Sequence, residues 1–66
     1  MKAEFIVSDM SCNHCVQTIT RAVQERSPGA EVRADLAAHR VTVEGEGDAA
    51  AIEAAIREAG YEVRAA

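Results

Sequence analysis

The segment MSCNHC, residues 10 to 15, holds both cysteines of this 66-residue chain. Two residues separate Cys12 from Cys15, and one of them is His14. A thiolate is both a nucleophile and a ligand for soft or borderline metal ions. A Cys-x-x-Cys pair therefore suits three kinds of chemistry, which are a redox-active dithiol, one half of a tetrahedral zinc site, and a site for a soft ion such as Cu(I).

The chain offers few further ligands for a closed zinc site. A structural zinc ion takes four ligands, and the histidines that accompany the two thiols are His14 and the distant His39. Structural zinc is therefore disfavoured without a second chain. A thiol–disulfide redox protein stays open as an alternative, because Cys-x-x-Cys at the start of a helix resembles the motif of disulfide oxidoreductases. A chain of 66 residues, however, leaves little room for the peptide groove of such an enzyme.

Carriage of Cu(I) is the alternative that we favour. Thiolates prefer Cu(I), and two of them across a loop hold the ion while leaving room for an incoming thiolate. A helix that begins beside Cys15 would present unpaired N–H groups and the positive end of its dipole to that sulfur, which stabilises the thiolate. Cys12 lies further out on the loop, so we expect it to be the more exposed sulfur and to detach first during transfer.

The composition argues against several other classes of function. The net charge is −4, and the seven basic residues are scattered, which disfavours binding to nucleic acid. No segment approaches the roughly 20 apolar residues of a membrane span, and the N-terminal segment does not read as a signal peptide. We therefore expect a cytoplasmic protein, in a compartment that keeps thiols reduced. No set of nucleophile, base and orienting group is recognisable, so we do not expect an enzyme.

The hydrophobic pattern predicts the elements that position the cysteines. Strand-like alternation and helix-like spacing follow one another in the order strand, helix, strand, strand, helix, strand. Turn residues separate these segments, and Asp48 and Gly60 suit the start and the end of the second helix. The predicted segments are a strand over 3–8, a helix stopped by residues 27–29, strands with apolar positions over 32–36 and 41–43 joined by a turn at 37–40, a helix over 48–59, and a strand over 61–64 centred on Val63.

This order predicts an α+β fold, the ferredoxin-like βαββαβ sandwich, in one domain spanning residues 1–66. In that arrangement two helices pack on one face of a four-stranded antiparallel sheet. The direction of the chain then places three connections at one end of the domain, namely the MSCNHC loop, the hairpin turn with His39, and the Gly60-Tyr61 turn. That end is the predicted working surface.

The motif Met10-x-Cys12-x-x-Cys15, between a first strand and a first helix of such a chain, resembles the heavy-metal-associated (HMA) domain family. Within that family it is similar to the free-standing bacterial copper chaperones of the CopZ type. The resemblance covers nearly the whole chain. It implies that Cys12 and Cys15 are the metal ligands. It also implies cytoplasmic delivery of Cu(I) to a copper-transporting P-type ATPase, or exchange with a copper-responsive regulator.

Two positions bear on the choice of metal within this resemblance. Zinc- and cadmium-type relatives usually carry Asp directly before the first cysteine, where this chain has Ser11, so copper is favoured. Many relatives have Gly before the motif methionine, where this chain has Asp9. A metal-binding module of a larger heavy-metal transporter is an alternative that the residues themselves do not decide.

Three neighbouring side chains are candidates for supporting roles. We expect Met10 to fill the core beneath the loop rather than to bind metal. His14 is either an exposed residue that tunes the local charge or a third ligand in a copper-bridged dimer. Tyr61 either covers the edge of the core or shields the metal site. We expect the apo protein to be a monomer, because its surface helices are polar, and excess Cu(I) to bridge two chains.

Overall fold

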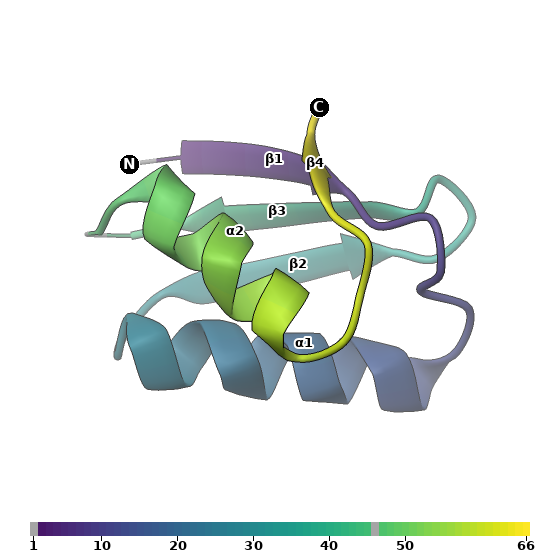
Figure 1. The fold of residues 1–66 in the computed structure, drawn as a ribbon, viewed down its shortest axis with the longest axis horizontal. Helices are drawn as coiled ribbons and strands as arrows, with labels where there is room; N and C mark the ends of the chain where they lie inside the picture. The colour runs from purple at the N-terminus through teal and green to yellow at the C-terminus, as the bar shows by residue number, and fades with distance from the viewer. Residues whose placement is uncertain (1, 46) are drawn as a thin grey trace.

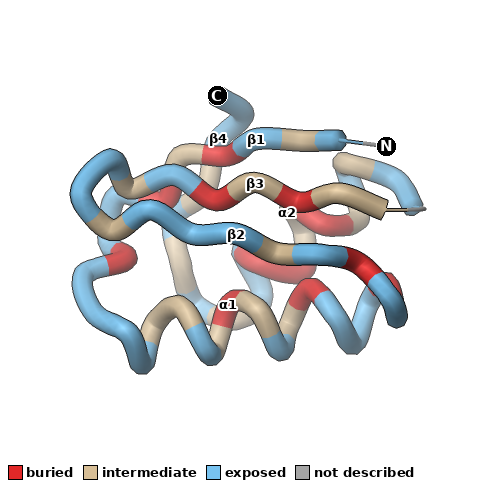
Figure 2. Tube along the Cα trace, turned by 180° about the vertical axis from the view of Figure 1, so that it is seen from behind, coloured by how far each residue is buried: buried red, intermediate tan, exposed pale blue. Residues whose placement is uncertain are grey.

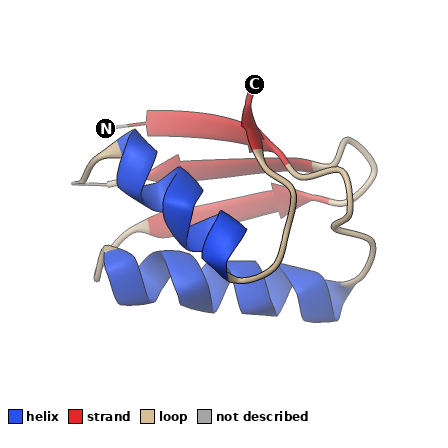
Figure 3. Cartoon of the chain, viewed as in Figure 1, coloured by secondary structure: helices blue, strands red, loops and turns tan. Residues whose placement is uncertain are grey.

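The computed structural model describes residues 2–45 and 47–66. Its elements run in the predicted order, which is thereby confirmed (Figure 1, Figure 3). They are β1 (Lys2–Ile6), α1 (Asn13–Arg26), β2 (Glu31–Asp35), β3 (Arg40–Glu44), α2 (Ala49–Glu58) and β4 (Arg64–Ala65).

The four strands form one antiparallel sheet in the order β2-β3-β1-β4. The two helices pack against each other and cover the same face of the sheet, with α1 against β2 and α2 against β1 (Figure 1). This is the ferredoxin-like sandwich that the sequence predicts. The loop between β1 and α1, the β2–β3 turn and the segment after α2 lie at one end of the molecule (Figure 1).

The core lies between the sheet and the helices, and its members follow the predicted periodicities. Along β3, buried Val41 and Val43 alternate with residues that remain partly exposed (Figure 2). Phe5 and Val7 are buried in the same way on β1 and just beyond it. The helices contribute side chains at helical spacing, which are Ile19, Val23, Ile52, Ala55 and Ile56. Met10 heads the fully buried side chains by volume, so the loop that carries the cysteines is fastened to the core.

The last strand differs from the prediction. It was expected over residues 61–64 and centred on Val63, but β4 comprises Arg64 and Ala65, which pair with Ile6 and Phe5. Residues 61–63 cross from α2 to the sheet without ladder pairing, and the Glu62 N–H donates to a side chain of the β1–α1 loop instead. Val63 packs half-buried against the core, which explains its apolar character without a strand.

Two further element ends are displaced by local hydrogen bonds. β1 ends at Ile6 rather than at residue 8, since the Val7 N–H donates to the His39 carbonyl at 2.8 Å and the chain then turns. The β2–β3 turn spans residues 36–39 rather than 37–40. Asp35 causes this shift, because its Oδ1 accepts from the N–H groups of residues 37 and 38 at 3.0 and 3.2 Å and closes the turn early.

Both predicted ends of α2 are confirmed. Asp48 is the N-cap residue, and its Oδ1 accepts a hydrogen bond from the Ala50 N–H at 3.0 Å. Gly60 follows the helix with φ +102°, a left-handed conformation that residues with a Cβ adopt only with strain. The helix begins at the end of the domain remote from the start of α1 and ends over the middle of α1 (Figure 1).

We predict that Asp48→Ala lowers the free energy of unfolding by about 1 kcal/mol, because it leaves the N–H of the first turn of α2 without its acceptor. Asp48→Asn should lose much less, since the amide oxygen is also an N-cap acceptor. Equilibrium urea unfolding of the three proteins measures the difference. Equal losses in the Ala and Asn variants would contradict the capping role.

Candidate metal site

The two cysteines lie at the N-terminus of α1. The helix begins at Asn13 and not, as predicted, beside Cys15, so Cys12 is the N-cap residue and Cys15 lies within the first turn. Both are free thiols, and their Sγ atoms are 3.5 Å apart. The turn of the helix thus brings two soft ligands to one point, at the helix end where the dipole favours negative charge.

The two thiols differ in exposure in the predicted sense. Cys12, the N-cap residue, is exposed. Cys15 is half-buried and packs against the hydrophobic core. The site therefore has an open sulfur and a sheltered sulfur.

The sheltered sulfur is an acidic thiol. The hydrogen bond from the Tyr61 side chain is the largest influence that lowers the pKa of Cys15, from an ordinary value of 9.0 to about 7. Hydrogen bonding from the backbone of Ser11 and from Cys12 lowers this pKa further, against an opposing contribution of burial. A much larger fraction of Cys15 than of an ordinary cysteine is therefore thiolate at neutral pH.

Tyr61 and Cys15 act on each other's proton affinity. The same contact raises the pKa of the Tyr61 phenol, because a phenol that donates to a thiolate holds its proton more tightly. The ring is half-buried and packs against the core, so it covers the core edge and lies beside the sulfur at once. Of the two roles expected for Tyr61, packing at the core edge is confirmed, and shielding of the metal site stays a prediction.

Met10 lies beneath the site rather than in it. Its side chain is fully buried in the core, which matches the expected filling role. Its carbonyl oxygen is 3.0 Å from Nδ1 of His39, and the Nδ1–H tautomer of that ring donates to it. Met10, two positions before Cys12, is thus held by both its side chain and its backbone.

His39 supports the loop from the β2–β3 turn. The sequence predicts His39 to be an ordinary polar residue of a hairpin turn rather than a ligand. In the structure His39 has φ +53°, a conformation that residues other than Gly seldom adopt. Its carbonyl also accepts from the Val7 N–H. Nothing in the sequence signals a partner 29 residues away, so this contact emerges only from the fold.

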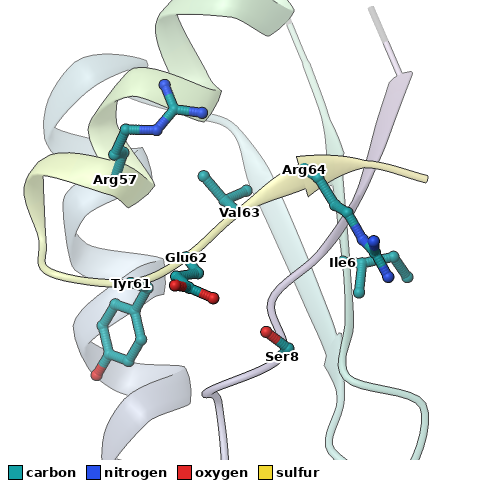
Figure 4. A pocket seen from close by; sticks show the side chains of 7 residues that line it. All are labelled: Ile6, Ser8, Arg57, Tyr61, Glu62, Val63 and Arg64. Atoms are coloured by element: carbon teal, nitrogen blue, oxygen red, sulfur yellow. The ribbon is translucent and has the colours of Figure 1, made fainter.

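Asp9 makes the third tie between the loop and the rest of the domain. The Glu62 N–H donates to its carboxylate, with distances of 3.2 Å to Oδ1 and 3.3 Å to Oδ2. The partner belongs to the segment between α2 and β4, where the Tyr61 side chain is directed away from those of Val63 and Arg64 (Figure 4). This segment borders a shallow hollow of about 480 Å³, lined by Ile6, Ser8, Arg57, Tyr61, Glu62, Val63 and Arg64.

The amino-acid sequence matches the heavy-metal-associated domain family over residues 4–62. The chain belongs to this family. Copper chaperone CopZ of Enterococcus hirae is 42% identical over 65 residues, which cover 94% of this chain and 94% of that protein. Copper-transporting ATPase 1 of Rhizobium meliloti is 40% identical over 65 residues, which cover 96% of this chain but 8% of that much longer protein.

A solved structure of the copper chaperone Atx1 from Synechocystis PCC6803 superimposes on this HMA domain with a TM-score of 0.88. The two are 33% identical, and the match covers 92% of this chain and 97% of the other. The family relation thus extends from the sequence to the arrangement of all the elements that position the cysteines.

In the described part of this HMA domain, no group of three or more His, Cys, Asp or Glu side chains is gathered around one point. His14 is exposed in the first turn of α1, and its carbonyl accepts from the Thr18 hydroxyl at 3.0 Å. The structure therefore brings together Cys12, Cys15 and Tyr61. It places Met10 below them and His14 at the surface. None of the described helices has the length and apolar character needed to cross a membrane.

We predict that Tyr61→Phe raises the pKa of the Cys15 thiol toward the ordinary range, because it removes the donor that stabilises the thiolate. In a Cys12→Ser background, alkylation of Cys15 should become about fivefold slower at neutral pH, and the rates should converge where both thiols are ionised. The measurement is alkylation rate against pH. The same change in a Cys15→Ser background is the control and should leave Cys12 reactivity unaltered. An unchanged pH profile for Cys15 would show that the Tyr61 hydroxyl does not act on this sulfur.

Proposed function

We propose that this HMA domain carries Cu(I) on Cys12 and Cys15 in the cytoplasm and passes it on by ligand exchange. The observation that carries the proposal is the pair of free sulfurs, 3.5 Å apart at the start of α1, with one of them exposed. Two soft ligands suit Cu(I), whereas a structural zinc ion takes four. The names of CopZ and of the related ATPase support copper as the metal. The role is binding and delivery rather than catalysis.

We infer from the difference in exposure that one sulfur moves more than the other when the ion binds. A nearly linear two-coordinate ion holds its sulfurs at about twice the metal–sulfur bond length, roughly 4.5 Å for bonds as long as Zn–S. The sulfurs must therefore separate from their distance of 3.5 Å. Cys12 is exposed and its side chain makes no capping hydrogen bond, whereas Cys15 is half-buried within the helix and packs against the core. We infer that Cys12 makes most of this movement.

The same difference in exposure supports a proposed order of ligand exchange. An incoming thiolate of the acceptor reaches the ion from the side of exposed Cys12 and forms a three-coordinate intermediate. Cys12 then leaves first, while Cys15 keeps the ion until a second acceptor thiolate replaces it. The low pKa of Cys15 favours loading, since a metal ion displaces a proton that is already weakly held.

The acceptor in this proposal is a copper-transporting P-type ATPase or a copper-responsive regulator. The match to Copper-transporting ATPase 1 places a segment similar to this chain within an ATPase of that kind, so donor and acceptor would present like sites. Ligand exchange between like sites needs little change in coordination at each step. The same match supports a second candidate, in which this domain is one module of a larger transporter.

The test of the metal is a competition titration with a Cu(I) chelator, repeated with zinc under reducing conditions. We expect Cu(I) to be bound many orders of magnitude more tightly than zinc. Cys12→Ser and Cys15→Ser should each weaken Cu(I) binding severely, because hard oxygen is a poor ligand for this soft ion. Comparable affinities for the two metals would reject copper specificity. Insulin reduction without measurable Cu(I) affinity would favour a thiol–disulfide redox protein.

The proposal includes a change of assembly with copper load. The apo chain should sediment as a monomer, and excess Cu(I) should bring two CxxC loops together, with exposed His14 near the shared ions. Ultracentrifugation across a copper titration follows the mass, and His14→Ala should weaken the dimer if the imidazole contributes. An unchanged mass throughout would remove the dimer. A dimer that is equally stable without the imidazole would remove His14 as a ligand.

A further inference from the structure

We propose that Asp9 is a positioning residue, a latch that holds the Tyr61 segment (residues 61–63) over the sheltered sulfur and thereby slows escape of the ion. The part of this inference that concerns Cu(I) rests on the proposed function, whereas the latch itself exists in the apo protein. Asp9 is in hydrogen-bond contact with the Glu62 N–H, and its influence on Cys15 passes through the neighbouring Tyr61.

The latch is a bifurcated hydrogen bond between residues 53 positions apart. The Glu62 N–H donates to both carboxylate oxygens of Asp9, at 3.2 and 3.3 Å. A hydrogen bond to an ionised acceptor is stronger than one between neutral groups. Because Glu62 directly follows Tyr61, a hold on its amide restricts the position of the tyrosine backbone.

The Tyr61 segment has few other ties. Before it, the Gly60 N–H donates to the Arg57 carbonyl at 3.0 Å and closes the end of α2. After it, sheet pairing resumes at Arg64 opposite Ile6. Between these two points lie residues 61–63. Among the described residues, the hydrogen bond that the structure gives to their backbone is the one from the Glu62 N–H to Asp9. Without it, the segment would depend on the Tyr61 side chain and on the packing of Val63.

Asp9 lies in a turn that is held on both sides by buried residues. Val7, two positions before it, is fully buried, and its N–H donates to the His39 carbonyl at 2.8 Å. Met10 after it is fully buried, and its N–H donates to the Val7 carbonyl at 3.2 Å. A side chain carried on such a turn can hold a second segment in place, because its own backbone does not yield.

The position of the latch gives it a consequence for metal exchange. Cys12 is exposed and open to an acceptor, whereas Cys15 is half-buried and packs, like Tyr61, against the core. The Tyr61 side chain also acts on the Cys15 sulfur. While Asp9 keeps the segment in place, a small competitor reaches the ion through Cys12 alone. Loss of the latch would let Tyr61 swing away and expose the second sulfur, so adventitious release should accelerate.

The first experiment uses the apo protein and needs no metal. Tyr61 is the one tyrosine of the chain and there is no tryptophan, so intrinsic fluorescence reports on this residue. Asp9→Ala should make Tyr61 more accessible to a collisional quencher and should speed hydrogen exchange at the Glu62 amide about fivefold, the factor expected for losing one exposed hydrogen bond. Asp9→Asn keeps an acceptor oxygen without the charge and should restore most of the protection.

A matched control is available at the far end of the domain. Asp48→Ala removes the same charge and the same kind of carboxylate-to-N–H hydrogen bond, but from the start of α2. It should leave Tyr61 quenching and Glu62 exchange as in the parent protein. Changes of equal size in both alanine variants would mean that global destabilisation explains them, and the latch would be rejected.

The second experiment measures the rate at which the Cu(I)-loaded protein gives up its ion to a small chelator. Asp9→Ala should release it about fivefold faster.

Unchanged Tyr61 quenching and Glu62 exchange in Asp9→Ala would overturn the latch, whatever the rate of Cu(I) release. An altered segment with an unaltered release rate would overturn its effect on exchange. An Asp9→Asn variant that behaves like Asp9→Ala would overturn the hydrogen-bond mechanism in favour of charge. If the parent protein binds no Cu(I), the proposed function fails, and the apo measurements still decide the latch.

Discussion

Burial of the Met10 side chain is the interaction on which the arrangement of this site depends. The chain must pass from the end of β1 to the start of α1 across the open end of the sandwich, and the fully buried thioether fixes it midway. The hydrogen bond from the His39 imidazole to the Met10 carbonyl also fixes the direction of the backbone at that point. The CxxC motif therefore starts from a defined point, although the cysteines themselves lie at the surface.

The small size of the domain makes further attachment of this loop necessary. A chain of 66 residues has a small core, and about 60% of the surface exposed in the unfolded chain is buried in folded domains of this size. A binding loop in such a domain has few contacts that restrict it, and a mobile loop does not hold two ligands at a fixed separation. Here the loop is fastened to three other parts of the fold, through Met10 to the core, through His39 to the β2–β3 turn, and through Asp9 to the segment after α2.

The parts of this structure that could be predicted from the sequence are those encoded by local chemistry. Alternation of Val41 and Val43 indicates β3, and an acidic N-cap at Asp48 indicates the start of α2, because each pattern acts over a few residues. The cysteine pair is legible for the same reason. The ties of Asp9 and His39 were not predictable, since each joins residues far apart in sequence and neither partner has a distinctive type. The misplaced last strand has the same origin, because an apolar Val63 fits a strand and a packed crossing equally well.

The unassisted N-cap of α1 has a thermodynamic consequence. The Cys12 side chain makes no capping hydrogen bond, so the cysteine at the helix start leaves first-turn N–H groups without the side-chain acceptor that Asp48 provides for α2. A pair of thiolates neutralising an ion at that point would brace the helix end that the free protein leaves uncapped. Ion binding and folding are then thermodynamically linked, because an ion that binds only the folded chain adds its binding free energy to the stability of the domain. The carrier would be most fragile when empty and most resistant to unfolding and proteolysis while it holds its ion.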